Sequence, residues 1–395
     1  DKIFKLFSKK DVIFINENEK NYKWEEMLRN EGWNIFKLDE LSGLIGKLQY
    51  LRDYYFLDCV WRIRLLVLAL RSPWLVQECY ASLRDKILWQ LFYRNYSVKN
   101  VIKMMVAENL TSSIVHKKNS VKTTFLYFST TESVVKERIN KEKSSCHEYY
   151  HMISDYVVSS RLSNSFIKSL ECSVGQYINI GPIFREISYE ANVNKKDYFN
   201  KLNIPKNSKV ISFLDHTAGN IGVFNSDAYK KFLNTIIHLA DKNKDIYFLF
   251  KSKKEAANLN RLAGFDITEI IDQIRFKVNS VYANDYEINS LEIIGISDLV
   301  VSAPMSSVIF ESLSAGVRTI SFDPEAQYRD FSVPSQKIPY LSAYSLDELE
   351  KLINRWLFET NDAQFQEFLN EHLLPYIEIN RDESSIEQFQ LFLKE

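Results

Sequence analysis

The chain has 395 residues, of which 46% are hydrophobic and 26% are charged, as in an ordinary globular protein. Its 50 basic and 51 acidic side chains nearly cancel, so no overall field would attract nucleic acid or an acidic membrane. The chain is longer than one ordinary hydrophobic core can serve, which predicts two α/β domains of roughly 150–200 residues each.

The four cysteines show neither paired nor C-x-x-C spacing, which indicates reduced thiols and no zinc site. The beginning of the sequence lacks the long apolar region of a signal peptide. The apolar run at 65–70 is far shorter than the ~20 residues that a membrane helix needs. We therefore expect a cytoplasmic protein without a transmembrane segment, with peripheral contact at the inner membrane left open.

Strand-like and helix-like segments alternate in the first half of the chain. Strands are expected at 11–15, 33–37, 122–128, 155–158 and 176–180, whereas 40–110 has helical periodicity almost throughout. The polar segment 189–208, which is rich in Asn and Lys, is expected to be a linker. Strands that alternate with helices indicate parallel βαβ units.

The second half repeats this alternation more sharply. Strands are expected at 210–214, 245–250, 298–302 and 317–322, with helices from Ser226, from about Met305 and after Ser345. Gly316 is expected to end the middle helix in a left-handed conformation. The sequence therefore predicts Rossmann-like domains at 1–204 and 205–360, followed by C-terminal helices at 361–395.

The strongest functional signal lies where the expected strand 298–302 turns through Pro304 into a helix. Ser306 and Ser307 stand in the first turn of that helix, where unpaired backbone N–H groups, the helix dipole and two hydroxyls suit a phosphate. Glu311 follows one turn later and can accept ribose hydroxyls. The alternative is a serine cap on an ordinary amphipathic helix.

Two further polar groups follow expected strands, at the edge where open α/β sheets bind ligands. Lys251 and Lys253 come after strand 245–250 and can neutralise a nucleotide phosphate, although a solvated lysine loop is the alternative. Asp215 follows strand 210–214 and can act as a base or as a covalent nucleophile; the alternative is an Asp that caps a loop. His216 and Asn220 continue the same loop and are candidates for substrate binding.

The first half offers weaker candidates. His147 and Glu148 can activate an acceptor hydroxyl, and Arg185 can hold an anionic sugar. His147 and His151 have a spacing that can bind metal on a helix, but H-E-x-x-H is absent and we expect no metal. The whole chain also lacks a P-loop motif, a G-x-G-x-x-G motif after a strand, and a D-x-D loop for a metal–diphosphate.

Residues 205–360 resemble the nucleotide domain of GT-B glycosyltransferases of bacterial surface-polysaccharide synthesis. The resemblance rests on Ser306-Ser307, the lysines after strand 245–250 and the Ala315-Gly316-Val317 turn. Thr319 stands where the Glu-x7-Glu families carry their second glutamate, so the pattern is more similar to that of CMP-sugar users. The His-Pro motif frequent in that group is absent. The resemblance implies an α/β GT-B architecture with two Rossmann-like domains facing a central cleft.

Within that group the chain most resembles the retaining β-Kdo transferases of lipopolysaccharide O-antigen and capsule assembly. This resemblance implies metal-independent transfer of Kdo, or a related ulosonic acid, from a CMP-sugar to a growing surface glycan. Asp215 would be the nucleophile, with retention through a covalent adduct. The implied partners are a nucleotide-sugar donor, a glycan or lipid-linked glycan acceptor and a polysaccharide-assembly complex, with no cofactor. Residues 1–204 match only in architecture.

Three alternatives stay open at this point. A CDP-glycerol-type polyol-phosphate transferase shares the Ser-Ser helix start. An inverting CMP-sialic acid transferase uses the same class of donor. A degenerate GT-B module would bind glycan without catalysis.

Overall fold

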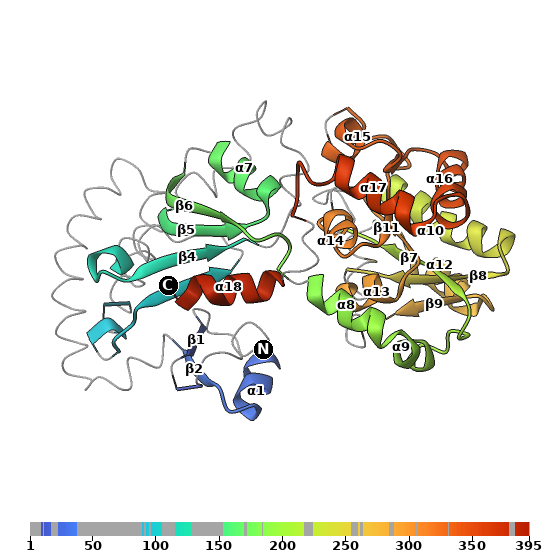
Figure 1. The fold of residues 1–395 in the computed structure, drawn as a ribbon. Helices are drawn as coiled ribbons and strands as arrows, with labels where there is room; N and C mark the ends of the chain where they lie inside the picture. The colour runs from blue at the N-terminus through green and yellow to red at the C-terminus, as the bar shows by residue number, and fades with distance from the viewer. Residues whose placement is uncertain are drawn as a thin grey trace, which may run out of the picture.

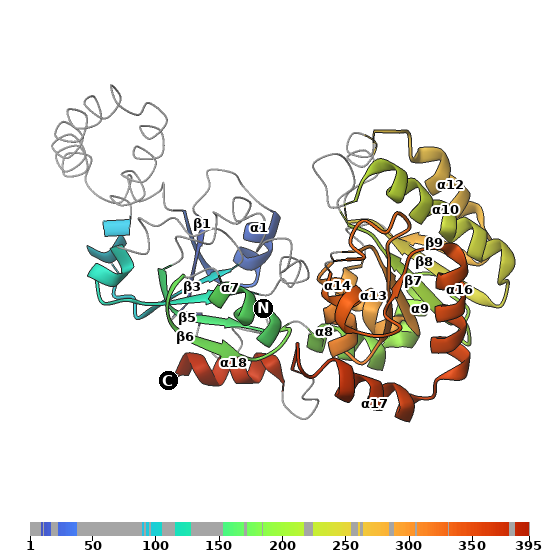
Figure 2. The same cartoon turned by 90° about the horizontal axis from the view of Figure 1, so that it is seen from above.

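The computed structural model describes residues 9–10, 12–16, 23–37, 89–90, 92–94, 96–104, 115–127, 153–169, 172–183, 185–216, 224–253, 260, 264–283, 288–304, 306–330, 332–378 and 384–394. These residues form two lobes, each built on parallel β-sheet (Figures 1 and 2). The α/β class and the parallel strands that the sequence predicts are confirmed.

The first lobe contains a two-stranded and a four-stranded parallel sheet. The smaller sheet pairs β1 (Ile13–Asn16) with β2 (Asn34–Lys37), and α1 (Lys23–Asn30) lies between them in sequence. The larger sheet has the order β3 (Asn100–Met104), β4 (Lys122–Leu126), β5 (Ile153–Ser159), β6 (Ser173–Asn179). Helix α7 (Arg161–Ser169) connects β5 to β6. The helical prediction for 40–110 is wrong at β3, where Val101 and Ile102 favour a strand through their branched side chains.

The second lobe is a six-stranded, all-parallel sheet with the order β12-β11-β10-β7-β8-β9. Its strands are β7 (Lys209–Leu214), β8 (Ile246–Lys251), β9 (Ser280–Ala283), β10 (Leu299–Ser302), β11 (Arg318–Phe322) and β12 (Ser342–Ala343). Counted from β7, this is the doubly wound order 3-2-1-4-5-6 of a Rossmann fold. The strand order reverses between β7 and β10, which are neighbours in the sheet. Such folds bind ligands at the carboxyl ends of the strands on either side of this switch point.

Helices cover both faces of the second sheet (Figures 1 and 2). They are α10 (Ser226–Lys242), α12 (Thr268–Phe276), α13 (Ser290–Ile296), α14 (Val308–Ser314), α15 (Val333–Lys337), α16 (Leu346–Asn354), a π-helical turn (Arg355–Glu359) and α17 (Asp362–His372). Alternate residues of β7 supply the two cores: Ile211 and Phe213 join one, and Val210 and Leu214 join the other. This arrangement explains why the strand reads as a continuous apolar run.

Polar residues that the sequence assigns to a linker instead form two helices, α8 (Arg185–Val193) and α9 (Lys195–Lys201). The linker prediction at 189–208 is wrong because this segment buries a sparse apolar face. Phe199 and Leu202 pack into the core beneath the second sheet. Helix α8 also packs tightly on α13, where a Cβ atom built on Gly295 would lie 2.1 Å from the carbonyl oxygen of Ser188.

The last helix, α18 (Ser385–Lys394), returns to the first lobe (Figures 1 and 2). Ile386 and Phe389 are buried in one core with Leu126 of β4 and Val158 of β5. The core of the first lobe therefore includes side chains from α18, the last described helix of the chain.

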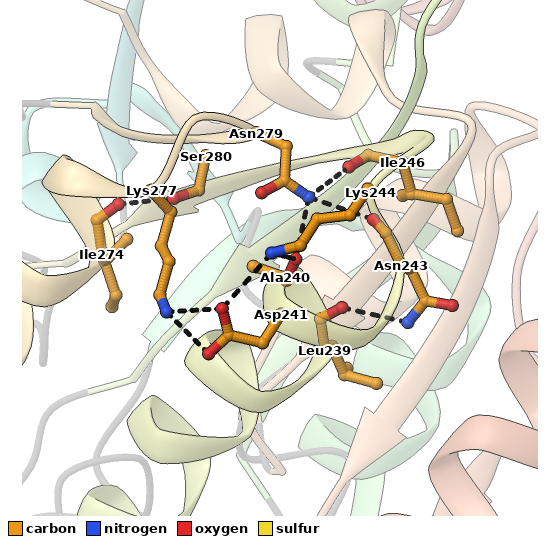
Figure 3. Close-up of polar contacts among 10 residues, drawn as sticks. All are labelled: Leu239, Ala240, Asp241, Asn243, Lys244, Ile246, Ile274, Lys277, Asn279 and Ser280. Atoms are coloured by element: carbon orange, nitrogen blue, oxygen red, sulfur yellow. Dashed lines mark hydrogen bonds and ion pairs between the residues drawn. The ribbon is translucent and has the colours of Figure 1, made fainter.

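A polar network fixes the amino ends of β8 and β9 (Figure 3). The side-chain amide of Asn279 donates to the carbonyl oxygens of Ala240, Asn243 and Ile246 at 3.0–3.1 Å. Lys277 reaches back to both carboxylate oxygens of Asp241 at 2.6 Å. These contacts hold β8 at the end opposite to its carboxyl edge.

None of the helices among the described residues is long and apolar enough to cross a membrane.

Candidate functional site

The carboxyl ends of β7, β8 and β10 lie side by side because β10 pairs with β7 and β7 pairs with β8. Leu214 at the end of β7 stands opposite both Ser302 of β10 and Lys251 of β8. Parallel register therefore brings the segments that follow these strands to one edge of the sheet, at the switch point.

Asp215 directly follows β7 and is 5% exposed. Its Oδ2 accepts a hydrogen bond from the hydroxyl of Tyr229 at 2.7 Å, and its Oδ1 accepts one from the backbone N–H of Lys253 at 2.5 Å. Burial raises the pKa of Asp215 to about 7, although both hydrogen bonds and the charges of Lys251 and Lys253 oppose that shift. At neutral pH the carboxyl is thus poised between its two protonation states.

Lys253 connects several groups at this edge. Its ammonium lies 3.4 Å from Nε2 of His216, which is also buried. Lys251, the last residue of β8, is 3% exposed, and its charge acts on Asp215. Between the two lysines, the hydroxyl of Ser252 lies 2.8 Å from that of Tyr282 on β9. Lys251 and Ser252 are therefore built into the sheet edge, which contradicts a solvated loop for Lys251, whereas the side chain of Lys253 is exposed.

The segment after β10 approaches the same lysine. Helix α14 begins at Val308, later than the sequence predicts, and Ser306 Oγ accepts a hydrogen bond from the Val308 N–H at 3.4 Å. Ser307 occupies the position before the helix with helical backbone angles and does not cap the helix backbone. Its side chain instead hydrogen-bonds Glu311, which is half-buried.

Glu311 resembles Asp215 in its electrostatics. Burial raises its pKa to about 7, while the hydrogen bond from Ser307 and the charge of Lys253 act in the opposite direction. Two carboxyl groups with raised pKa values therefore flank one lysine. Clusters of this kind are typical of functional sites.

The structure thus brings together most of the second-domain residues that the sequence singles out. Lys253 contacts Asp215 and His216, and its charge acts on Glu311. Ser307 joins the group through its hydrogen bond to Glu311, and the charge of Lys251 acts on Asp215. Pro304 is buried next to this segment. Asn220, His147 and Glu148 lie outside the described residues.

Arg185 has a different environment. It is buried at the start of α8, where its guanidinium lies 3.4 Å from the backbone oxygen of Glu378 and 3.7 Å from the carboxylate of Glu186. Through these contacts Arg185 packs against the segment that connects α17 to α18.

Sequence reasoning missed Tyr229. The residue lies near the start of α10, which is capped by Asn225 and not by the expected Ser226. A tyrosine at a fully buried position carries a hydroxyl that needs a partner. The sequence does not reveal that the partner is Asp215, because the pairing depends on how α10 packs on β7.

The described residues contain no group of three or more His, Cys, Asp or Glu side chains that is arranged to hold a metal ion.

A family model described as "Polysaccharide biosynthesis PFTS motif protein" matches residues 61–353. The chain belongs to this family. The match covers most of both lobes, including every described residue of the site. No protein with a curated description matches the chain in sequence.

Solved structures resemble this PFTS family member in fold. A glycosyltransferase from Rickettsia africae has 14% sequence identity and a TM-score of 0.52, with 97% of this chain and 90% of that chain covered. UDP-GlcNAc 2-epimerase from Neisseria meningitidis, solved with bound UDP-GlcNAc, also has 14% identity and a TM-score of 0.52, with 80% and 81% covered. At this identity the likeness shows the fold alone, a GT-B architecture. The family's description supports a role in polysaccharide biosynthesis.

Proposed function

We propose that the protein transfers a sugar from a nucleotide donor to a growing surface polysaccharide, and that the donor binds at the carboxyl edge of the second sheet. The observation that carries this proposal is the convergence of Asp215, Lys253 and Glu311 at the switch point. Lysine ammonium groups and serine hydroxyls suit a phosphate, and carboxylates suit sugar hydroxyls or an electrophilic carbon.

The family's name supports the proposal that the donor phosphate binds at the segment that begins at Pro304. Read as residue letters, its P-F-T-S motif agrees with the tetrapeptide that begins at Pro304 in its first and last residues. Ser306 keeps the hydroxyl of the threonine, and Ser307 matches the serine. A motif that names a whole family is expected to serve the function which its members share.

The finer proposal is that the donor is CMP-Kdo or a related CMP-activated ulosonic acid. An Asp215 oxygen attacks the anomeric carbon while the bond from that carbon to the CMP phosphate oxygen breaks, and CMP leaves with the electron pair. The acceptor hydroxyl then attacks the same carbon, loses its proton to a base and releases the Asp215 carboxylate. Two inversions give net retention. His147 or Glu148 is proposed as the base on sequence grounds.

The environment of Asp215 is compatible with this role. Each carboxylate oxygen accepts one hydrogen bond, but the two oxygens together offer about four lone-pair positions. A pKa of about 7 leaves a substantial ionised fraction at neutral pH. Lys251 and Lys253 stabilise that ionised form.

The test is a nucleotide-release assay with CMP-Kdo, CMP-sialic acid, CDP-glycerol and UDP-GlcNAc, with and without a polysaccharide acceptor and with EDTA present. We expect release from CMP-Kdo that persists in EDTA, and a sugar adduct on Asp215 in mass spectra of the enzyme mixed with donor alone. Asp215→Asn should abolish release while its circular dichroism spectrum stays unchanged. Full turnover by Asp215→Ala would exclude the nucleophile role, and release from CDP-glycerol alone would move the proposal to a polyol-phosphate donor.

A further inference from the structure

The hydroxyl of Tyr229 contacts one oxygen of Asp215, at a place that the sequence does not mark. Tyr229 is fully buried near the start of α10 and donates to Oδ2 of Asp215 at 2.7 Å. The other oxygen, Oδ1, accepts from the backbone N–H of Lys253. The carboxylate is therefore held from two elements, one bond to each oxygen.

Packing alone does not require this hydroxyl. The ring of Tyr229 lies against those of Phe224 and Phe265, with centroids 6.0 and 6.4 Å apart. A phenylalanine would fill the same space among these rings. The hydroxyl is the atom that distinguishes the two residues, and its acceptor is a buried carboxylate.

Charged and titratable groups face this pair from the neighbouring elements. Lys251 and Lys253, at the end of β8, act on Asp215, and Tyr282 of β9 acts on Tyr229. His216 contacts the ammonium of Lys253, and Glu311 of α14 lies within the field of the same ammonium. A substitution of Tyr229 must therefore leave these neighbouring groups in place, so that any change in the titration of Asp215 can be attributed to the lost hydroxyl.

We propose that Tyr229 is a positioning residue for Asp215, which fixes the plane of the carboxylate through Oδ2 and stabilises its ionised form. This proposal rests on the proposed function, in which ionised Asp215 is the nucleophile. Hydrogen bonds from a hydroxyl to a charged oxygen are about twice as strong as those between neutral groups. Loss of the Tyr229 hydroxyl should therefore disfavour the ionised carboxylate more than the protonated one.

The first experiment needs no activity. Urea unfolding of Tyr229→Phe is compared with that of wild type at pH 5.5 and 8.5, and again in an Asp215→Asn background. We expect the loss of stability caused by Tyr229→Phe to be larger at pH 8.5, and to be equal at both pH values when Asp215 is replaced. An equal loss at both pH values in the wild-type background would overturn the proposal.

Tyr198 provides a matched control. Its hydroxyl also donates to a carboxylate, Glu292, at 2.8 Å in the same lobe. Because Tyr198 does not contact Asp215, Tyr198→Phe should lose stability without the dependence on Asp215. The same dependence in Tyr198→Phe would show that the effect is general and would count against a specific role of Tyr229.

The second experiment measures the pH profile of CMP release from CMP-Kdo. Tyr229→Phe should move the acidic limb upward by about one to two pH units and keep most of the rate on the alkaline plateau. An unmoved limb, or an equal loss of rate at every pH, would overturn the positioning role. If wild type releases no CMP, the proposed function fails, whereas the unfolding experiment still decides the role of Tyr229.

Discussion

The backbone nitrogen of Lys253 lies 2.5 Å from Oδ1 of Asp215, so a hydrogen bond to a buried carboxyl joins the ends of β7 and β8. The side chain of the same lysine extends toward His216 and acts on Glu311. One residue thus links the segments after β7, β8 and β10. The backbone of Lys253 and its ammonium have separable roles, which substitutions can distinguish.

Replacing Lys253 by methionine removes the ammonium and leaves the backbone hydrogen bond to Asp215 in place. We expect the affinity for CMP to fall by about tenfold or more, since hydrogen bonds to charged groups contribute about 1.5–3 kcal/mol. Calorimetric titration with CMP checks this result. Lys244→Met is the matched control, because Lys244 is an exposed lysine of the same lobe near the amino end of β8 (Figure 3). Equal CMP affinity in both variants would remove Lys253 from the phosphate site.

The rate of sugar transfer should fall as the pH drops through about 7. Burial raises the folded-state pKa of Asp215 to that value, and the proposed nucleophile is its ionised form. Below pH 6 most of the enzyme would carry a protonated Asp215 and turn over slowly. The measurement is kcat for CMP release between pH 5.5 and 9. A flat profile across pH 7 would contradict an ionised Asp215 in the rate-determining step.

The stability of the fold should change with pH in the opposite direction. Because the folded pKa of Asp215 lies above the unfolded value, its contribution to stability is complete below about pH 4 and is lost as the pH rises through about 7. Asp215→Asn cannot ionise, so it should gain stability relative to wild type between pH 5 and pH 8, by on the order of a few kcal/mol. Urea midpoints at the two pH values measure the difference. A constant difference between the two proteins would show that the carboxyl does not titrate in this range.

Gly295→Ala should destabilise the second lobe without altering any group of the proposed site. The new methyl group would meet the Ser188 carbonyl oxygen at 2.1 Å, so α8 must move away from α13. Overpacking of this kind costs about 1–3 kcal/mol, and the opposing atoms here belong to the backbone of Ser188 and to the short side chain of Ala191, which cannot swing away. Thermal unfolding measures the loss. Ser290→Ala, in the first turn of the same helix, should be nearly neutral by comparison.

Phe389→Ala should unfold the first lobe preferentially. Phe389 is fully buried between α18 and the four-stranded sheet, and emptying such a site costs about 3–5 kcal/mol. Hydrogen exchange of β4 and β5 should increase while that of β7 and β10 stays unchanged. Leu391 lies on the same helix but is 62% exposed, so Leu391→Ala should leave both lobes unaffected.

The sequence predicts four of the six described strands of the second lobe, because each of these four is a short apolar run that is followed by polar residues. The expected strands at 210–214, 245–250, 298–302 and 317–322 are confirmed as β7, β8, β10 and β11. Gly316 has the left-handed conformation predicted for it, with φ of 75°. Ser345 caps α16 as expected. In these segments local preference and tertiary packing favour the same structure.

Errors occur where packing overrides the local pattern. The segment 189–208 is mostly polar, and only a few apolar side chains, such as Phe199, indicate that it lies against a core. β9 (Ser280–Ala283) is short and follows a helix closely, so its four residues give little signal. Asp215 could be singled out from its position after a strand, but its hydrogen bond to Tyr229 depends on tertiary packing. Contacts between elements are the part that one sequence does not reveal.

Because α18 returns to the first lobe, that lobe is built from two segments of the chain that are separated by the whole second lobe. Phe389 and Ile386 complete a core whose other members, Leu126 and Val158, precede the whole second lobe in the chain. A fragment that stops before residue 385 would expose the apolar surface beneath α18 and would be prone to aggregate. Expression of the first lobe alone therefore requires residues 385–394, either fused to that lobe through a linker or added in trans as a separate peptide. A fusion partner attached after α18 would be tethered to the first lobe, although the preceding helices belong to the second.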